Sequence, residues 1–395
     1  MKRILFVDDD PSVLQGIKRM LHSKRNEWEI AFAPGAEEAL RLFEQKEFDV
    51  VVSDIRMPGM DGATLLAKIK ERFPGAARII LSGYSEADVA IRATASAHQF
   101  LAKPCDPKEL VAAVDRVCNV QGFTLDAKVR RIVGQIGQLP SLPRAYVALR
   151  EAVENPDTSI AKVVEIVETD IAMVAKILQL VNSAFFGLAR PITSLHGAVN
   201  YLGLNTIRNL ALMAEAFRVF TPGPGIPRSL YDQTREHGQR SAEIVARLPL
   251  GPPLRDLTIV ACLLQDVGTL VLASKLPQAF LSASSIVEKR GCQMFEAEEE
   301  VLGTSHAEVG AYLLGLWGIP QAIAEAVAHH HRPTRIPHSG LDTCTAVYTA
   351  SVLARQPRTV QASEYELSEY DRKCFEELGL LDRLPEFCQV SLQEV

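Results

Sequence analysis

The chain has 395 residues, and its 48 acidic residues against 42 basic ones give a formal net charge of −6 at pH 7. This length exceeds what one small domain needs, so we expect at least two domains. Direct binding to duplex DNA is not expected, because it normally requires a basic stripe, whereas residues 1–122 hold 17 basic and 18 acidic residues and the remainder holds 25 and 30.

Over residues 1–122, short apolar runs alternate with segments of helical period. The runs include 4–7, 50–53, 78–81 and 100–102, and the helical segments are 13–21, 36–43, 64–73, 87–95 and 109–117. Alternation that begins with a strand and repeats five times predicts a parallel sheet with helices on both faces. In such a doubly wound α/β fold, ligands bind beyond the carboxyl ends of the strands.

Polar side chains follow four of these apolar runs. Asp54 ends the second run and precedes a tight loop of sequence RMPGMDG, which is how a phospho-accepting aspartate is presented. Asp8 and Asp9 follow the first run and, with Asp54, supply the oxygen ligands that Mg²⁺ prefers. Ser82 and Lys103 follow the other two runs, where a hydroxyl can bond a phosphoryl oxygen and an ammonium can neutralise it.

Taken together, these residues resemble the receiver domains of two-component response regulators, over nearly all of residues 1–122. The resemblance implies that a cognate sensor histidine kinase phosphorylates Asp54. It also implies a Mg²⁺ site in which Asp54 and Asp9 are direct ligands, Asp8 acts through water and Arg56 contributes its backbone carbonyl.

The same resemblance assigns the phosphoryl contacts and the switch residue. Ser82 and Lys103 would contact the phosphoryl group, Lys103-Pro104 stands where the family has a cis peptide bond, and Phe100 stands where it has an aromatic switch residue. Other interpretations stay open. An Asp-rich segment after a strand can be a turn or a helix cap, which is the role we expect of Asp10, and Phe100 can be an ordinary core aromatic.

After a linker near residues 121–128, the pattern changes to helices alone. Helices are expected at 126–138, 143–153, 160–168, 171–182, 194–203, 206–220, 230–248, 254–273, 282–290, 292–303, 307–315 and 322–331. The expected parts are a receiver (1–122), a linker and connecting helix (123–138), an all-α output domain (139–345) and a helical C-terminal extension packed on it (346–395). The extension is acidic, but its apolar residues recur at helical spacing, which a disordered tail would lack.

Within the α-region the sequence resembles the HDOD family, an output domain related to metal-dependent phosphohydrolases of the HD type. The stretches that carry this resemblance are 139–143 (LPSLP), 178–187 (LQLVNSAFFG), 192–195 (ITSL), 198–199, 202–204 and 306–320. The resemblance implies a helical domain that signals by binding a partner protein.

An open question is whether the metal site of the HD hydrolases survives in this domain. Such a site needs several histidine and aspartate ligands and a water that attacks phosphorus. His237 matches the first ligand position and Asp266 the aspartate of the His-Asp pair, but Gln265 replaces the histidine. A final aspartate is also missing, with Tyr348 and Ser351 in that region.

Histidines further along the chain keep the metal question open. Neighbouring residues of a helix are turned by about 100° from one another, so the adjacent residues His329, His330 and His331 cannot share one helix face. Pro333 marks a helix end, and histidine near a helix C-terminus suits the helix dipole. The expected degenerate, non-catalytic site consists of His237, Gln265, Asp266, His306, His329 and His330. A residual metal site is the alternative.

The sequence therefore predicts a response regulator whose only chemistry is phosphoryl transfer at Asp54. A phosphorylation-controlled phosphodiesterase of cyclic dinucleotides or related phosphoesters is the alternative, and Gln265 argues against it. A transcription factor is a third possibility, and the acidic charge balance argues against DNA binding. The expected partners are the kinase, a protein bound by the HDOD domain and, after phosphorylation, a second copy of the chain. Scattered cysteines, no secretory signal and no uninterrupted apolar run of ~18 residues predict a cytoplasmic protein outside the membrane.

Overall fold

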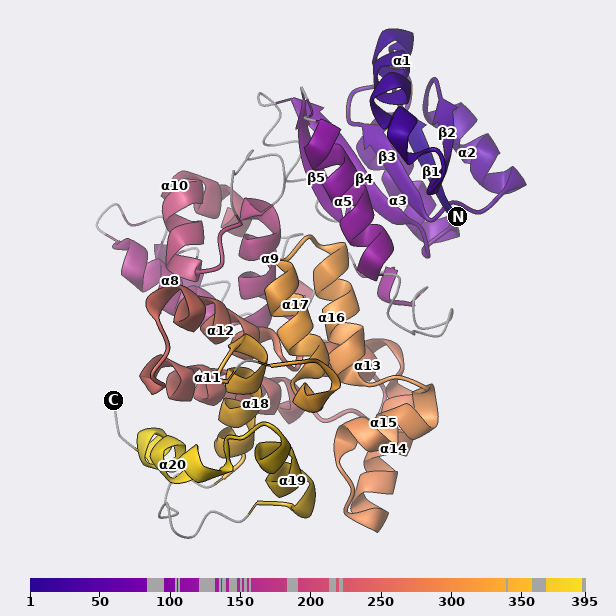
Figure 1. Ribbon diagram of the computed structural model, residues 1–395. Coiled ribbons are helices and arrows are strands. Elements are labelled where there is room, and N and C mark those ends of the chain that lie inside the picture. Colours follow the sequence, from indigo (N-terminus) through magenta and orange to yellow (C-terminus); the bar gives the residue numbers. More distant parts are fainter. Residues whose placement is uncertain are drawn as a thin grey trace.

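In the computed structural model, the first part of the chain is a five-stranded parallel sheet flanked by helices (Figure 1). The structure describes residues 1–83, 96–103, 105, 107–120, 132–134, 136, 140–141, 148–149, 151–152, 155, 158–182, 191–212, 218–219, 223–338, 340–356 and 367–392. The strands are β1 (Lys2–Val7), β2 (Trp28–Ala33), β3 (Val50–Asp54), β4 (Ala77–Gly83) and β5 (Gln99–Lys103), in the spatial order β2-β1-β3-β4-β5.

The central parts of the strands are largely apolar because both faces of the sheet are covered. Ile4 and Phe6 of β1 point into one hydrophobic cluster, and Leu5 and Val7 point into another. This follows from the alternation of side chains along a strand. The helices of this domain are α1 (Pro11–Met20), α2 (Ala36–Gln45), α3 (Gly62–Arg72) and α5 (Pro107–Val120), with a short 3₁₀ helix η1 (Leu21–Lys24) after α1. The helix predicted at 87–95 lies outside the described residues.

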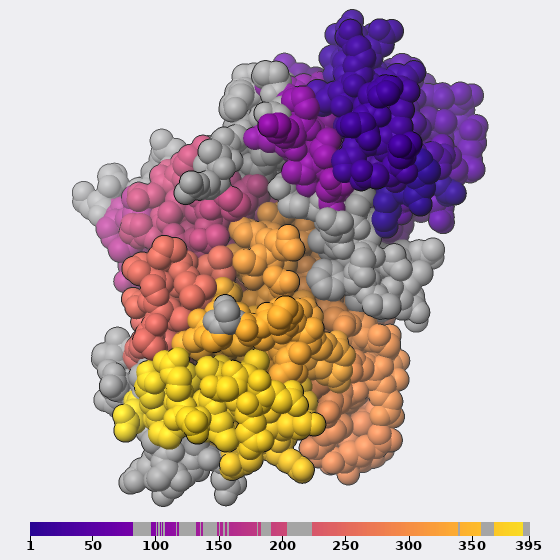
Figure 2. Space-filling view, in the orientation of Figure 1, coloured from indigo at the N-terminus to yellow at the C-terminus, as the bar shows by residue number. Residues whose placement is uncertain are grey.

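The second part of the chain is largely helical, so the predicted combination of an α/β receiver fold and an all-α region is confirmed (Figure 1). In Figure 2 the receiver, in indigo, lies at the top of the molecule and the C-terminal residues, in yellow, lie at the bottom. Its helices are α8 (Ile160–Glu168), α9 (Ile171–Val181), α10 (Leu195–Leu212), α11 (Ser229–Arg247), α12 (Pro252–Leu264), α13 (Val267–Lys275), α14 (Pro277–Arg290), α15 (Met294–Leu302), α16 (His306–Leu316), α17 (Gln321–His329), α18 (Thr343–Ala354), α19 (Glu369–Glu377) and α20 (Leu384–Leu392), with 3₁₀ helices η3 (Pro333–Arg335) and η5 (Leu381–Arg383). The last helices lie at the end of the molecule away from the receiver, and Tyr348 of α18 packs on Phe375 of α19.

Two of the predictions for this region are wrong. The segment 206–220 does not stay helical, because β7 (Arg218–Val219) pairs in parallel with β6 (Pro140–Ser141), and such a long-range pairing leaves no local period in the sequence. The single helix predicted at 254–273 is two helices, because the chain breaks between α12 and α13 at Gln265 and Asp266. Most of the helices predicted at 126–138 and 143–153 lies outside the described residues.

Among the residues that the structure describes, one stretch, Pro252–Lys275, is long and apolar enough to cross a membrane by length and composition alone. It comprises α12 and α13, and 72% of its most apolar window is buried inside the fold. Its apolar character is therefore accounted for by packing in the protein core.

A close helix contact fixes the relative position of α13 and α16. A Cβ atom on Gly268 of α13 would lie 1.9 Å from the backbone oxygen of His306 and 2.8 Å from the backbone nitrogen of Gly310. The absence of a side chain at Gly268 therefore allows the two backbones to approach each other closely. This contact lies two residues after Asp266 and at the start of α16, so it sets the distance between Asp266 and His306.

We expect Gly268→Ala to destabilise the helical region by about 1–3 kcal/mol, because the added methyl group must displace backbone atoms. Thermal unfolding followed by circular dichroism measures the effect. Gly16→Ala is the matched control: it lies in α1 with nothing within 4 Å of the added Cβ, so it should raise stability by about 0.5–1 kcal/mol. Equal stability of Gly268→Ala and the unchanged chain would contradict the close contact.

Candidate functional site

At the carboxyl ends of the receiver strands, an acidic site surrounds one ammonium group. The side chains of Asp8 and Asp54 are buried, with residue exposures of 2% and 7%, while Asp9 is exposed. Lys103 Nζ at the end of β5 lies 2.7 Å from Asp8 Oδ2 and 2.5 Å from Asp54 Oδ1. The remaining carboxylate oxygens accept backbone N–H groups: Asp8 Oδ1 from Asp10 at 2.9 Å, and Asp54 Oδ2 from Arg56 at 3.1 Å.

The electrostatics of this site favour an additional cation. Burial raises the pKa of Asp54 above its ordinary value although Lys103 opposes the shift. Burial also disfavours the charged form of Lys103, but hydrogen bonds to Asp54 and Asp8 raise its pKa overall. One ammonium thus faces two buried carboxylates, and this set of oxygen donors, with Asp9 beside it, fits Mg²⁺.

Of the residues predicted for this site, two are placed by their backbone alone and one is not placed. Ser82 and Phe100 belong to β4 and β5 by their backbone, and their side chains lie outside what the structure describes, as does Pro104. Arg56 follows Asp54 with an exposed side chain, as a contribution through its backbone would allow. Asp10 caps α1 as predicted, since its side chain accepts the N–H of Ser12.

The loop after Asp54 folds back onto the strand that precedes it. The N–H of Gly62 donates to the backbone oxygen of Ile55 at 2.9 Å, and a Cβ on Gly62 would lie 1.9 Å from the backbone oxygen of Asp54. The glycine is therefore needed for the approach of α3 to the end of β3.

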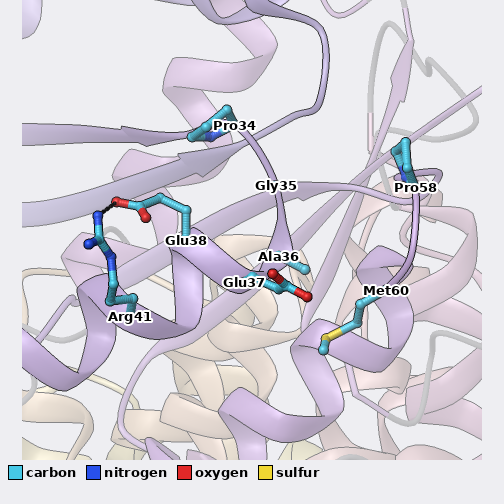
Figure 3. A pocket seen from close by; sticks show the side chains of 8 residues that line it. All are labelled: Pro34, Gly35, Ala36, Glu37, Glu38, Arg41, Pro58 and Met60. Carbon is cyan, nitrogen blue, oxygen red and sulfur yellow. Dashed lines mark hydrogen bonds and ion pairs between the residues drawn. The ribbon is translucent and has the colours of Figure 1, made fainter.

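A surface hollow of about 580 Å³ lies beside this loop, between Pro58 and Met60 on one side and the start of α2 on the other (Figure 3). Glu38 and Arg41 line it and form an ion pair of 2.7 Å with each other. None of the residues of the acidic site lines this hollow.

A buried arginine that the sequence analysis did not single out lies at the opposite ends of the receiver strands. Arg78 near the start of β4 is fully buried and donates to the backbone oxygens of Ser96, Ala76 and Gly134 at 2.6, 2.9 and 2.6 Å. His98 beside it accepts the backbone N–H of Arg78 at its Nδ1, 3.1 Å away. Since Gly134 belongs to the segment that follows the receiver, these bonds tie that segment to the sheet.

Further hydrogen bonds join the start of β5 directly to the helical domain. Gln99 Nε2 donates to the backbone oxygens of Gly315 and Leu316 at the end of α16, at 3.5 and 3.3 Å. Gln179 of α9 donates to the backbone oxygen of His98 at 3.0 Å, while Lys176 donates to Gln179 Oε1 at 3.2 Å. Together with the bonds of Arg78, these contacts form what we call the junction, and α5 runs alongside α16 next to it (Figure 1).

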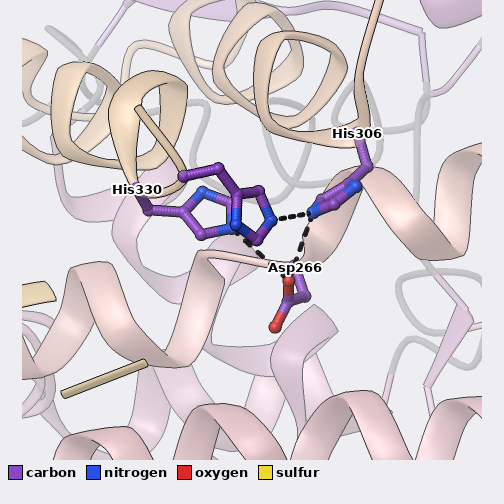
Figure 4. Close-up of side chains that lie close together, drawn as sticks. Asp266, His306 and His330 are labelled. Carbon is purple, nitrogen blue, oxygen red and sulfur yellow. Dashed lines mark hydrogen bonds and ion pairs between the residues drawn. The ribbon is translucent and has the colours of Figure 1, made fainter. Parts of the chain in front are cut away.

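In the helical domain, five side chains converge on a second polar cluster, from α11, α16, the break between α12 and α13, and the turn after α17. Asp266 lies in the break between α12 and α13, and His306 and His330 point toward it (Figure 4). Their Nε2 atoms lie 3.5 and 3.6 Å from Asp266 Oδ1, and His331 Nε2 lies 2.9 Å from His306 Nε2. On the other side, His237 Nδ1 of α11 lies 2.7 Å from Asp266 Oδ2.

The partners of the ring nitrogens define where their protons are. His237 faces the backbone oxygen of Ser351 at 3.2 Å and Asp266 at 2.7 Å, and both atoms are acceptors, so both ring nitrogens donate. Burial disfavours this charge, but Asp266 raises the pKa of His237 above its ordinary value. His237 in turn holds the pKa of Asp266 well below its usual range despite burial.

His306 and His330 are each oriented through Nδ1. The Nδ1–H of His306 donates to Glu298 Oε2 at 2.6 Å, and that of His330 donates to the backbone oxygen of Val327 at 2.7 Å. Although burial opposes it, Glu298 and Asp266 raise the pKa of His306 to about 10, so its Nε2–H can donate to His331. Burial lowers the pKa of His330, which leaves a neutral ring with a lone pair on Nε2.

The structure corrects the predicted membership of this cluster. His331 belongs to it and His329 does not, because α17 ends at His329 and the chain leaves the helix before His330 and His331. The rings of His330 and His331 lie 3.9 Å apart, so the helical turn of about 100° does not separate them.

The structure also places the residues found where the sequence analysis expects the metal ligands of the hydrolases to be lost. Gln265 is fully buried and donates from Nε2 to Ser241 at 3.0 Å. Ser351 lies 3.4 Å from His237 Nε2, whereas Tyr348 points away and donates to Asp371. Ser351 therefore stands on the side of the cluster where the sequence analysis noted the missing aspartate.

Comparison with protein families separates the chain into the same two parts. Residues 4–115 match the response regulator receiver domain, and residues 139–333 match the HDOD domain. Together these ranges cover more than three quarters of the chain.

Individual relatives resemble parts of the chain. An uncharacterized protein of Treponema pallidum (strain Nichols) is 28% identical over 213 residues, which cover 53% of this chain and 40% of that protein. The DNA-binding transcriptional regulator NtrC of Escherichia coli (strain K12) is 42% identical over 114 residues, 29% of this chain and 24% of NtrC. The chain thus spans less than half the length of these curated relatives. A solved structure of a virulence factor from Campylobacter jejuni subsp. jejuni, 21% identical, has the same fold over 68% of this chain and 98% of its own, with a TM-score of 0.50.

The junction should weaken on acidification, because His98 is buried and its pKa lies well below the ordinary 6.5 owing to burial and the charge of Arg78. Below pH 6.5 the unfolded chain binds a proton that folded His98 excludes, so stability is present above this pH and is lost as the pH falls, by up to about 1.4 kcal/mol per pH unit. Chemical denaturation between pH 7.5 and 5 measures this slope.

His98→Asn should flatten this pH dependence, because Asn keeps an acceptor near the position of Nδ1 but does not titrate. His22→Asn, at an exposed position, is the control and should leave the slope unchanged. A slope that is the same in His98→Asn as in the unchanged chain would show that His98 does not cause it.

Proposed function

The chain belongs to the response regulators that join a receiver domain to an HDOD domain, and we propose that a sensor histidine kinase phosphorylates it on Asp54. The phosphorylated protein would signal through a non-catalytic HDOD domain that binds a partner protein. The observation that carries this proposal is the position of Asp54, buried at the carboxyl end of β3 between Asp8 and Lys103. The domain limits proposed are 1–122, 123–138, 139–345 and 346–395.

The residues of the acidic site fit the demands of phosphoryl transfer. An Asp54 oxygen would bond to phosphorus as the P–N bond of the kinase phosphohistidine breaks, and Lys103 would offset the added charge. Mg²⁺ bound by Asp8, Asp9, Asp54 and the backbone carbonyl of Arg56 would supply further charge stabilisation.

Several observations support a non-catalytic output domain that does not bind DNA. Gln265 stands where the hydrolases have a metal-binding imidazole and bonds to Ser241, and the region expected to carry the final carboxylate ligand has Tyr348 and Ser351 instead, with Ser351 3.4 Å from His237. The match to NtrC is confined to 114 residues, and the part after residue 122 is acidic in balance. These features favour a domain that acts through protein contacts. The proposal also includes, as the sequence predicts, a cytoplasmic location and a homodimer that forms on phosphorylation.

The junction offers a route from Asp54 to the HDOD domain. Lys103 ends β5 and Gln99 begins it, so one strand reaches from the acidic site to α16. The two residues are four positions apart, roughly 13 Å along a strand. In β4, Arg78 near one end and Ser82 near the other span the same distance. A displacement of Lys103 or Ser82 toward a phosphoryl group would therefore strain the bonds of the junction.

Incubation with acetyl phosphate and Mg²⁺ should label the protein at one site, and peptide mapping should locate the label on Asp54. Asp54→Asn should abolish labelling. Asp61→Asn is the control, because Asp61 caps α3 in the same loop and Asn keeps a capping side chain, so its labelling should be unchanged. Undiminished labelling of Asp54→Asn would refute the assignment.

Phosphorylation should also change the junction, with the coupling of about 1–3 kcal/mol that is usual for allosteric proteins. Hydrogen exchange with and without beryllofluoride, a phosphoryl mimic, should show altered protection in α9 and α16, and light scattering reports any change in mass. Gln99→Ala should reduce the response in α16, whereas Gln321→Ala, at an exposed site in α17, should not. Unchanged protection and unchanged mass together would rule out this route.

A further inference from the structure

We propose that Asp266, His306, His330 and His331 bind one divalent transition-metal ion, with Zn²⁺ as the best match. One ligand atom from each of these side chains lies within 4.8 Å of all the others. Three imidazole nitrogens and one carboxylate oxygen are a donor set typical of zinc, for which four protein ligands in tetrahedral arrangement form a structural site. This inference is independent of phosphorylation at Asp54.

The strongest indication is the position of His330 Nε2. His330 is fully buried, and among the described residues this atom has no hydrogen-bond partner. Because Nδ1–H donates to Val327, Nε2 carries a lone pair, and this lone pair faces Asp266 Oδ1 at 3.6 Å. A fully buried acceptor and a largely buried one that face each other repel, and a cation between them satisfies both.

His306 and His331 present a second pair of donors to the same point. Their Nε2 atoms lie 2.9 Å apart, which requires one proton between them. A metal ion would replace this proton, because coordinating imidazoles are deprotonated at the bound nitrogen. With Zn–N distances of about 2.0–2.1 Å, the donors of a tetrahedral site are roughly 3.3–3.4 Å apart. Three of the six separations among the four ligand atoms, 2.9, 3.5 and 3.6 Å, bracket this value, and all six are within 4.8 Å, so small side-chain movements would bring the donors to the metal.

Three of the proposed ligands, His306, His330 and Asp266, are each oriented by a hydrogen bond to a group that is not itself a ligand, as is usual for metal sites. Glu298, itself fully buried, accepts the Nδ1–H of His306, and the backbone oxygen of Val327 accepts that of His330. His237 donates to Asp266 Oδ2 and so leaves Oδ1 directed at the histidines. His237 uses both ring nitrogens as donors, so it serves as a positioning residue here and not as a ligand.

Titration of the full-length chain with Zn²⁺ alone, after removal of metals by a chelator and in the presence of excess Mg²⁺ to occupy the receiver, tests this proposal. Calorimetry should show one tight equivalent of Zn²⁺ per chain. Co²⁺ should bind at the same stoichiometry with the intense visible absorption of a tetrahedral ion, whereas Co²⁺ held by oxygen ligands in the receiver would absorb weakly.

His330→Gln and His331→Gln should each lose this tight equivalent. His329→Gln is the matched control, because it makes the same chemical change one residue outside the cluster and should bind as the unchanged chain does. Circular dichroism establishes that the variants are folded, and the partly buried position of His331, compared with the fully buried His330, makes its replacement the milder of the two. The proposal would be overturned by no stoichiometric binding to the unchanged chain, by undiminished binding to folded His331→Gln, or by weak, octahedral-type Co²⁺ absorption.

Discussion

The parallel direction of the receiver strands is the constraint on which the rest of the structure depends. It gathers the ends of β1, β3 and β5 at one edge, so that Asp8, Asp54 and Lys103 meet within hydrogen-bond distance. The same direction places the starts of β4 and β5 at the opposite edge, where Arg78, His98 and Gln99 meet the rest of the chain. In β4, which connects the two edges, residues 77–81 are all buried, so packing holds this part of the strand on both faces.

The junction is made of hydrogen bonds to backbone oxygens more than of contacts between charged side chains. Arg78 donates to three carbonyl groups, and Gln99 and Gln179 each donate across the domain boundary to carbonyl groups. Bonds from a buried guanidinium are worth about 1.5–3 kcal/mol each, and their loss leaves a desolvated charge without compensation. The apolar cluster continues through this boundary, from Leu101 of β5 to Leu313 of α16. Packing and polar bonds therefore join the two domains at the same place.

The sequence patterns were sufficient to predict the receiver fold and the meeting of Asp8, Asp54 and Lys103, because both follow from local signals. Apolar runs predict strands, and the residue after each run is placed at the sheet edge by topology alone. The junction could not be predicted in this way, since Arg78 stands at the start of an apolar run with no sign of the three distant carbonyl groups that it binds. The histidine cluster was predicted with His329 in place of His331 because a helix end cannot be located to one residue from periodicity. The break at Gln265 and Asp266 was missed because both flanking segments are apolar and fit one continuous helix.

Helix α16 links the junction to the histidine cluster. Its last residues, Gly315 and Leu316, accept bonds from Gln99, and its first residue is His306, about 15 Å away along the helix axis. On the proposed route from Asp54, a displacement of Gly315 and Leu316 at the junction would reach His306 through this one continuous helix. The close approach of Gly268 to the backbone of His306 holds the start of α16 against α13. A displacement of α16 would change the spacing between His306 and Asp266, on which a bound metal ion would depend. The cluster is therefore placed where it can sense the state of the receiver, even though it lies in a different domain.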